Sequence, residues 1–266
     1  MKKTVIITGG ASGMGRAVSL FLAQKGYYVY SLDIKNIRGN VDNIFEIEVD
    51  VCSQESIDNA FKIISSQTKE IFAILNFAGI VMMNSLVEIS ESDFMKIFNV
   101  NFFGAYRINK TFLPLILNNK GKILITTSEL APNKIIPFNS IYSISKKALD
   151  AYAEGLRMEL GLLGIQVITL RPGAVSTNMI DHSNSALHNF EKNTVLYKDI
   201  TKKFKKIVDG EQGSAIPAEK IAQLVYKILE KKHSRYVYAK NISKKLKLLN
   251  AVPTGLQLKI YKKLLK

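Results

Sequence analysis

The chain has 266 residues, of which 47% are apolar and 22% are charged, and its formal net charge is +15. This apolar fraction excludes a largely disordered chain, and 16 glycines with one cysteine exclude collagen-like and disulfide-rich proteins. One α/β core can hold this length, because single cores stop growing at roughly 250–300 residues. Cys52 alone can form neither an intramolecular disulfide nor a metal cluster, and no apolar run is long enough to span a bilayer. We therefore expect a cytoplasmic protein without a metal site.

The positive charge is concentrated at the C-terminus. Residues 231–266 contain 11 Lys and Arg and no acidic residue, which leaves 26 basic against 22 acidic residues in 1–230. No groove-reading helix and no series of aromatic stacking platforms accompanies these charges. Nucleic acid is therefore not the expected partner.

The C-terminal segment 241–266 has the periodicity of two short amphipathic helices separated by Pro253 and Gly255. The expected apolar stripes are Ile242, Leu246 and Leu249, then Leu256, Ile260 and Leu264 with Tyr261 and Leu265 beside them. The stripes can dock on the preceding domain, 1–240, and leave the lysines in water. Alternatively, the segment can lie on an anionic membrane surface as a peripheral element.

Within 1–240, short apolar strands alternate with helices. We expect strands over 4–8, 28–32, 44–49, 71–75, 122–126, 166–170 and 235–239. The expected helices are 16–25, 54–66 with Ser53 as N-cap, 91–117 with Pro114 breaking its last turns, 140–162 and 218–231. This pattern predicts an α/β fold with a doubly wound, Rossmann-type parallel sheet and a site at the carboxyl ends of the strands. The polar stretch 176–215 is the expected substrate lid.

The first strand-to-helix loop has the composition of a dinucleotide-binding loop. It reads Thr8-Gly9-Gly10-Ala11-Ser12-Gly13-Met14-Gly15, in which glycines allow a diphosphate to approach the helix N-terminus. Asp33, at the end of the second strand, can accept both hydroxyls of the adenosine ribose and would repel a 2′-phosphate. We therefore expect NAD rather than NADP, although Lys35 and Arg38 could offset that repulsion.

Tyr142 and Lys146 form a candidate acid–base pair at the start of the helix 140–162. Their i, i+4 spacing places phenol and ammonium on one helix face. A phenol has a pKa of about 10, and a neighbouring ammonium is expected to lower it toward a useful range. Taken alone, Tyr142 could equally be a packing residue.

The order of these motifs along residues 3–240 resembles the single-domain short-chain dehydrogenase/reductase family. The matching features are TGxxxGxG at 8–15, Asp33, Asp50-Val51, Asn76-x-Ala78-Gly79, Asn101, Ser128, YxxxK at 142–146 and Pro172-Gly173-x-Val175-x-Thr177. The resemblance implies that Tyr142 is the general acid/base, that Lys146 binds the nicotinamide ribose, that Ser128 bonds the substrate oxygen and that Asn101 holds a water. It also implies cofactor contacts for the glycine loop, Met14, Asp33, Asp50, Val51, Asn76, Ala78, Gly79, Pro172, Gly173, Val175 and Thr177.

Two positions depart from the family pattern. The family's serine usually stands 13 residues before its tyrosine, a count that here falls on Glu129. We expect a loop one residue longer, with Ser128 as the site serine and Thr127 in reserve. Phe77 replaces the second Asn of the family's NNAG, a change expected to affect the sheet rather than the chemistry.

The resemblance and an apolar set of residues predict a secondary alcohol or ketone substrate with a bulky apolar body, such as a sterol, bile acid or related lipid. The residues expected to face it are Val81, Met82, Met83, Leu130, Ile135, Ile136, Met179 and Phe190. A 3-oxoacyl thioester reductase is the alternative enzyme, though such members usually end in a Gly-Gly strand absent here. A non-catalytic nucleotide-binding regulator is the other alternative. A homodimer through 91–117 and 140–162 is expected, and a tetramer is less expected.

Overall fold

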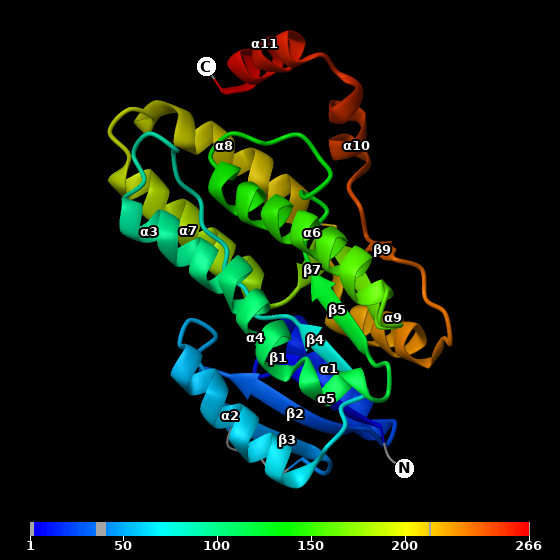
Figure 1. Cartoon of the computed structure of the whole chain (residues 1–266). Coiled ribbons are helices and arrows are strands. Elements are labelled where there is room, and N and C mark those ends of the chain that lie inside the picture. The colour runs from blue at the N-terminus through cyan, green and yellow to red at the C-terminus, as the bar shows by residue number, and fades with distance from the viewer. Residues whose placement is uncertain (1–2, 36–40, 213, 266) are drawn as a thin grey trace.

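The computed structural model describes residues 3–35, 41–212 and 214–265, and Figure 1 shows a central sheet between layers of helices. Within these residues a seven-stranded sheet has the order β3-β2-β1-β4-β5-β6-β9, and every pair is parallel. The strands are β1 (Thr4–Thr8), β2 (Tyr28–Asp33), β3 (Ile44–Glu48), β4 (Ala73–Asn76), β5 (Lys122–Thr126), β6 (Gln166–Pro172) and β9 (Val237–Lys240). The expected Rossmann-type sheet is confirmed. Strand order reverses between β1 and β4, where such sheets bind ligands.

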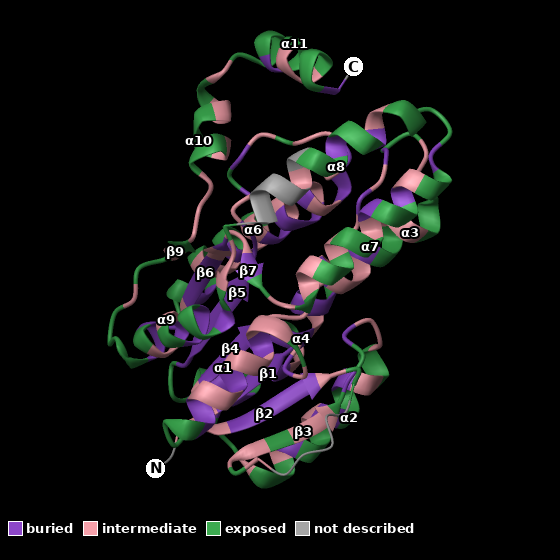
Figure 2. Ribbon diagram, turned by 180° about the vertical axis from the view of Figure 1, so that it is seen from behind, coloured by how far each residue is buried: buried purple, intermediate pink, exposed green. Residues whose placement is uncertain are grey.

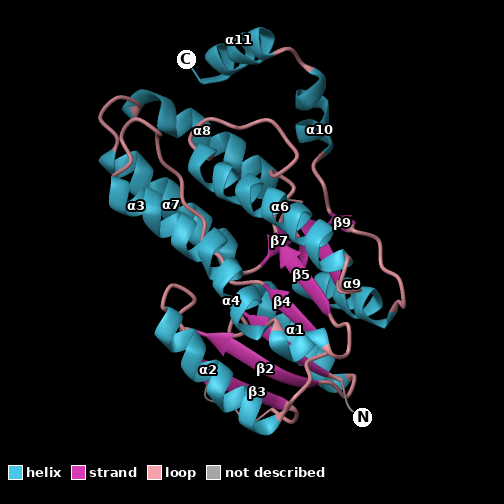
Figure 3. Cartoon of the chain, viewed as in Figure 1, coloured by secondary structure: helices cyan, strands magenta, loops and turns pink. Residues whose placement is uncertain are grey.

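Helices cover both faces of the sheet (Figure 3). They are α1 (Gly13–Gln24), α2 (Gln54–Gln67), α3 (Glu91–Phe98), α4 (Gly104–Phe112), α5 (Pro114–Leu117), α6 (Ser140–Gly161) and α9 (Ala218–Glu230). Val18 of α1 and Val225 of α9 belong to one buried cluster, whereas Ile57 of α2, Ile108 of α4 and Leu149 of α6 belong to the other. Each central strand contributes side chains to both clusters, so both faces of these strands are apolar. As expected, Ser53 caps α2, accepting a hydrogen bond from the Ser56 N–H.

The helix expected over 91–117 is interrupted. A π-helical turn, Asn99–Phe103, joins α3 to α4, and Pro114 begins the separate helix α5. Pro114 breaks the helix as expected, whereas the π turn was not foreseen. A π turn inserts an extra residue and locally re-aims side chains, and such turns are frequent at functional sites. This one contains Asn101.

The expected lid over 176–215 consists mainly of two helices, α7 (Asn178–Asn193) and α8 (Lys198–Gln212). Between the sheet and these helices runs a small ladder of β7 (Val175–Ser176) and β8 (Ile216–Pro217). The lid has its own apolar cluster centred on Phe138, whose ring centroid lies 5.0 Å from that of Phe190 and 5.2 Å from that of Phe204. The lid is therefore a packed layer rather than an irregular loop.

The tail forms the two expected helices, α10 (Lys244–Ala251) and α11 (Thr254–Leu265), and Figure 2 shows them as mostly exposed ribbon beyond α8. The stripe predicted for α11 is wrong in detail: Leu256 and Leu264 are 50% and 53% exposed. Tyr261 and the buried Leu265 instead pack on the lid cluster. The face of α11 that packs inward is set by its contacts with α8 and with α10, where Gln257 Nε2 donates to the Leu249 carbonyl oxygen at 2.6 Å.

In the described part of the chain, no helix combines the length and apolar character required to cross a membrane.

Candidate active site

The glycine loop has the close backbone packing and the uncapped helix start that a diphosphate requires. Gly9 has a φ of +68°, and a Cβ there would lie 2.8 Å from the backbone nitrogen of Ala78. Thr8 Oγ1 accepts hydrogen bonds from the N–H groups of Phe77 and Ala78, which fixes the loop against the end of β4. The Ser12 side chain makes no cap bond at the start of α1, and the first turn of α1 carries no acidic residue. The loop therefore fits a dinucleotide phosphate group.

Asp33 faces this loop from the end of β2. Its Oδ2 accepts from the Ala11 N–H at 3.0 Å and its Oδ1 from the Lys35 N–H at 3.1 Å. A carboxylate has about four acceptor positions, so both oxygens retain capacity for ribose hydroxyls. Arg38, the other residue considered near a 2′-phosphate, lies outside the described residues.

The neighbouring Asp50-Val51 turn lies at the end of β3. Asp50 is exposed, and its Oδ1 accepts from the Cys52 N–H at 2.8 Å, while Val51 is buried against Gly104 of α4. The turn is thus rigid, with a carboxylate outside and an apolar side chain inside.

The side chain of Asn76, one of the expected cofactor contacts, is hydrogen-bonded within the fold through its amide nitrogen. Its Nδ2 donates to Asn109 Oδ1 at 2.9 Å and to the Leu124 carbonyl oxygen, so the amide ties β4 to α4 and β5. Successive side chains of a strand point to opposite faces of the sheet, and that of Asn76, at the end of β4, points toward α4. The motif alone does not show which of the two faces this is. Asn76 therefore links β4 to its neighbours directly before the position where Phe77 replaces the family's second Asn.

Gly79 brings two predicted site residues together. A Cβ on Gly79 would lie 3.2 Å from Asn101 Oδ1 and 3.4 Å from Lys146 Nζ. Asn101 Oδ1 accepts from the Ile80 N–H at 2.8 Å, and its Nδ2 donates to Ser145 Oγ at 3.0 Å. Asn101, on the π turn, therefore joins the loop after β4 to α6 one residue before Lys146.

Tyr142 lies between Ser128 and Lys146. The Ser128 hydroxyl is hydrogen-bonded to the Tyr142 phenol, although 14 positions separate the two residues. The Lys146 ammonium lies 5.9 Å from the centroid of the Tyr142 ring and donates to the Thr126 carbonyl oxygen at 3.2 Å. The longer loop thus brings Ser128 to the tyrosine, while the Thr127 hydroxyl donates to Asp150 Oδ1, further along α6, at 3.0 Å.

The electrostatics of this pair differ from our expectation. Burial raises the pKa of Tyr142 to about 12, the bond from Ser128 opposes the rise and the charge of Glu129 adds to it. Burial also lowers the pKa of Lys146 to about 8. In the protein alone, desolvation therefore outweighs the attraction between phenolate and ammonium, because both charged forms lose their water.

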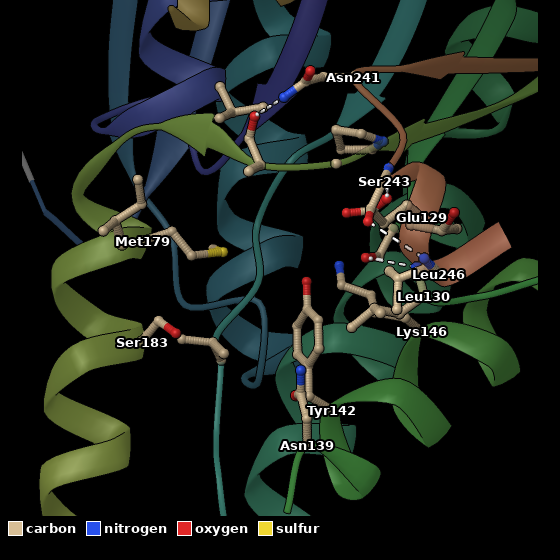
Figure 4. Close-up of a pocket in the computed structure, with 18 of the residues that line it drawn as sticks. Glu129, Leu130, Asn139, Tyr142, Lys146, Met179, Ser183, Asn241, Ser243 and Leu246 are labelled. Atoms are coloured by element: carbon tan, nitrogen blue, oxygen red, sulfur yellow. Dashed lines mark hydrogen bonds between the residues drawn. The ribbon is translucent and has the colours of Figure 1, made fainter. Parts of the chain in front are cut away.

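A cavity of about 510 Å³ opens directly above these residues, as Figure 4 shows for Tyr142 and Lys146. Val81, Met83, Leu130, Ile136 and Met179 line it as predicted. Met82 and Ile135 do not, and Phe190 is instead buried in the lid cluster against Phe138, because the lid needs an apolar core of its own. Pro172, Gly173, Val175 and Thr177 line the cavity beside the glycine loop, and a Cβ on Gly13 would lie 3.3 Å from that of Thr177.

No pattern in the sequence indicated that the tail would form part of this cavity. Residues 241–246 line it, and Glu129 Oε2 accepts from the Ser243 N–H at 2.7 Å. Glu129, considered above only as a rival to Ser128, is itself part of the lining. Asn139 and Ser183 are two further polar lining residues that our reading missed (Figure 4). Only the folded arrangement brings these positions together.

Comparison with known proteins agrees with this geometry. A family model described as short chain dehydrogenase matches residues 3–188. The chain is 32% identical to a 3-amino-tetrahydro-pyrrolizinone reductase of Xenorhabdus hominickii over 68% of this chain and 64% of that protein, slightly under two thirds of its length. It is 27% identical to a 3-ketodihydrosphingosine reductase of Bacteroides thetaiotaomicron over 86% of this chain and 84% of that protein.

The fold has equally clear counterparts among solved structures. A short-chain dehydrogenase from Streptomyces avermitilis superposes with a TM-score of 0.78 at 22% identity, over 99% of this chain and 95% of that one. The family match spans the glycine loop, Ser128, Tyr142 and Lys146. The chain belongs to the short-chain dehydrogenase/reductase family of oxidoreductases, whose members act on CH–OH donors with a nicotinamide cofactor.

Proposed function

We propose that this protein is an NAD(H)-dependent oxidoreductase that interconverts a secondary alcohol and a ketone on a bulky apolar substrate, such as a sterol, bile acid or related lipid. The observation that carries the proposal is the hydrogen-bonded pair Ser128–Tyr142 beside Lys146 at the base of an apolar cavity. That arrangement presents a proton donor and a hydroxyl partner to one substrate oxygen.

In this proposal Tyr142 is the general acid/base. During reduction its phenol donates a proton to the oxygen of the forming alcohol, and Ser128 orients that oxygen. Lys146 stabilises the resulting phenolate, and Asn101 holds the backbone at Ile80 and the adjoining turn of α6 in place. The bound nicotinamide dinucleotide supplies or accepts the hydride.

The cofactor would be held by the glycine loop with Ser12, Met14 and Asp33 at the adenosine and phosphate end. Asn76 and Ala78 would line the adenosine ribose, Asp50 and Val51 would contact the adenine, and the 172–177 segment would hold the nicotinamide carboxamide. NAD is preferred in this proposal because the Asp33 carboxylate faces the loop. Lys35, two residues after Asp33, is an exposed cation, and it would have to offset the repulsion between Asp33 and a 2′-phosphate for NADP to bind.

The test is a titration of the purified protein with NADH and, in parallel, NADPH, followed by nicotinamide fluorescence. Keto-steroids, keto bile acids, retinal and acetoacetyl thioesters are then added and the absorbance of the reduced cofactor is followed. Tighter binding of NADH and its oxidation by a sterol or bile acid support the proposal. Preference for NADPH contradicts the cofactor assignment, and turnover of only the thioester would favour the 3-oxoacyl reductase.

We also propose that the tail, 241–266, is a peripheral contact with an anionic membrane surface on the cytoplasmic side. The support is an exposed apolar set next to exposed lysines: Leu248, Leu256, Leu258 and Leu264 with Lys247, Lys259, Lys262 and Lys263. Basic amphipathic helices with this composition bind anionic lipid. Because the tail also lines the cavity, such contact would bring a lipid substrate to the entrance.

Vesicle co-sedimentation tests the tail directly. The wild-type protein should bind vesicles containing phosphatidylserine and release them in high salt, and the triple variant Lys259→Glu/Lys262→Glu/Lys263→Glu should not bind. A matched variant with three lysines of the lid replaced, Lys202→Glu/Lys205→Glu/Lys206→Glu, should still bind. Equal binding by both triple variants would refute a contact through the tail.

The homodimer is the third part of the proposal. α3 and α6 are adjacent, and the surface of α3, the π turn, α4 and α6 exposes the large apolar side chains Met95, Phe103, Tyr106 and Met158. A two-fold interface would bury them. Light scattering of the eluting protein should give twice the monomer mass, and Met158→Glu should reduce that mass.

A further inference from the structure

Asn139 is an uncharged polar residue in a cavity whose walls are mostly apolar. It lines the cavity and lies three residues before Tyr142, directly before the first residue of α6. Its neighbour Phe138 is buried in the lid cluster, and Ile136 packs against that cluster. Figure 4 shows Asn139 beside Tyr142, at the end of the ring away from the phenol oxygen. Asn139 therefore faces the part of a substrate that extends from the reacting carbon toward the lid.

The Asn139 side chain does not perform the task for which its position is known. Asn139 is the N-cap residue of α6, a position where an Asn side chain commonly accepts a hydrogen bond from the first helical turn. Among the described residues, the Asn139 side chain makes no such cap bond. The Ser143 N–H and hydroxyl instead donate to the Asn139 backbone carbonyl oxygen, at 3.0 and 2.9 Å. The backbone of Asn139 thus holds this turn, and its carboxamide is left for another role.

The side-chain oxygen of Asn139 is a buried acceptor without a donor. Within the part of the chain that the structure describes, Oδ1 is shielded from solvent and has no hydrogen-bond partner. Leaving a buried polar atom unpaired costs free energy, so a native fold contains few of them. Rotation about the Cβ–Cγ bond exchanges Oδ1 and Nδ2, so the carboxamide can turn either atom toward a ligand in the cavity. A hydroxyl group, which both donates and accepts, can supply the missing bond.

Ser183 adds a second hydrogen-bonding group from the wall formed by α7. It is half-buried and lies four residues after Met179, so the two side chains share one face of the helix. Both line the cavity, and Figure 4 shows them directed from α7 toward Tyr142. Asn139 and Ser183 are uncharged, and an ionised group placed between them would lose its water without gaining a countercharge from either. The group that suits this pair is therefore neutral.

We infer that Asn139, assisted by Ser183, is a specificity-determining residue that binds a second hydroxyl group of the substrate. The substrate class is then an apolar hydroxyketone or diol. Its second hydroxyl is separated from the reacting carbon by a ring or a short chain, because the ring of Tyr142 stands between Asn139 and the phenol oxygen. This inference rests on the proposed alcohol–ketone chemistry and narrows its substrate.

Two ketones that differ in one hydroxyl group test the inference: 4-octylcyclohexanone and 4-hydroxy-4-octylcyclohexanone. They are titrated calorimetrically into the protein with oxidised cofactor, which cannot reduce them. The wild type should bind the hydroxylated ketone about tenfold more tightly. Asn139→Leu, which is similar in size but lacks hydrogen-bonding atoms, should lower this ratio to about 1, and Ser183→Ala should lower it to about 3. The controls Asn189→Leu and Ser185→Ala, at exposed positions of α7, should leave it unchanged.

Unfolding experiments separate binding from a structural role. Asn139→Leu should unfold at the same urea concentration as the wild type or higher, because it removes an unpaired buried acceptor. A lower midpoint together with an equal loss of affinity for both ketones would assign Asn139 to holding α6 and overturn the inference. A wild type that does not favour the hydroxylated ketone, or that binds neither ketone, would overturn it as well.

Turnover distinguishes failure of this inference from failure of the proposed chemistry. Reduction of both ketones by NADH with equal kcat/KM would overturn the inference and leave the alcohol–ketone chemistry intact. Binding that is selective for the hydroxylated ketone, without reduction of either ketone, would support the role of Asn139 and count against that chemistry.

Discussion

The side-chain amide of Asn101 pairs with both backbone polar groups of Ile80: Oδ1 accepts from the N–H at 2.8 Å and Nδ2 donates to the carbonyl oxygen at 3.0 Å. The same Nδ2 reaches Ser145 Oγ on α6. One side chain therefore sets the distance between the loop after β4 and the helix that carries Tyr142 and Lys146. Gly79 lies beside both Asn101 and Lys146, and a Cβ at this position would come within 3.2 Å of Asn101 Oδ1.

Replacing Tyr142 by Phe should abolish turnover without affecting the fold. Removal of a positioned general acid/base typically costs 10²–10⁴-fold, and we expect about 10³-fold or more here. The affinity for NADH should stay within about threefold, because the ring is retained. Steady-state kinetics and fluorescence titration measure the two effects. Tyr236→Phe, at an exposed position, is the control, and turnover surviving in Tyr142→Phe would contradict the assigned role.

Replacing Asp33 by Asn should shift the cofactor preference toward NADPH by about tenfold, because it removes the charge that repels a 2′-phosphate. The amide oxygen can still accept from the Ala11 N–H, so the loop should keep its shape. The ratio of the dissociation constants for NADH and NADPH is the measurement. Asp42→Asn, at an exposed position before β3, should leave the ratio unchanged. An equal shift in both variants would mean that Asp33 does not face the ribose.

Lys146→Met should stabilise the protein at neutral pH while destroying activity. Burial lowers the pKa of Lys146 from 10.5 to about 8, so between these values the unfolded chain binds more protons and wild-type stability rises with pH. Below pH 8 the full cost of burying the ammonium is present, and removing it should gain about 1–3 kcal/mol.

The pH dependence of that gain is the decisive measurement. Urea unfolding at pH 7 and at pH 9.5 should show the advantage of Lys146→Met shrinking as pH rises, because the wild-type amine loses its proton. Lys227→Met, at an exposed position of α9, provides the control. A gain that does not vary with pH would attribute the effect to packing instead.

Two glycines with the same backbone handedness should respond differently to alanine. Gly9 and Gly26 have φ of +68° and +83°, but a Cβ meets the Ala78 backbone at Gly9 and nothing within 4 Å at Gly26. Gly26→Ala should cost about 1 kcal/mol for the left-handed conformation alone. Gly9→Ala should cost about 2 kcal/mol more and weaken cofactor binding, because the loop must move away from β4. Equal losses in chemical denaturation would show that the contact with Ala78 is unimportant.

The catalytic pair shows how far sequence reasoning extends. Lys146 and Tyr142 are one helical turn apart, and local geometry alone brings them to one face. The pKa of Tyr142, in contrast, could not be read from that spacing, because its direction depends on how much water the fold removes and on Glu129, which reaches the tyrosine through the cavity. Asn101 was identified by its motif, but its π turn depends on packing against the loop at Ile80.

Local sequence patterns were sufficient to predict the parallel sheet, the lid, the glycine loop and the YxxxK helix, because hydrophobic periodicity, capping and glycine placement are local properties. The tertiary structure alone decided that Asn76 serves the sheet, that Phe190 belongs to the lid core and that the tail borders the active site at Glu129. These outcomes depend on contacts between segments far apart in the chain. Ser243 and Glu129 are separated by 114 residues, and only the folding of the whole sheet brings the tail to the end of β5.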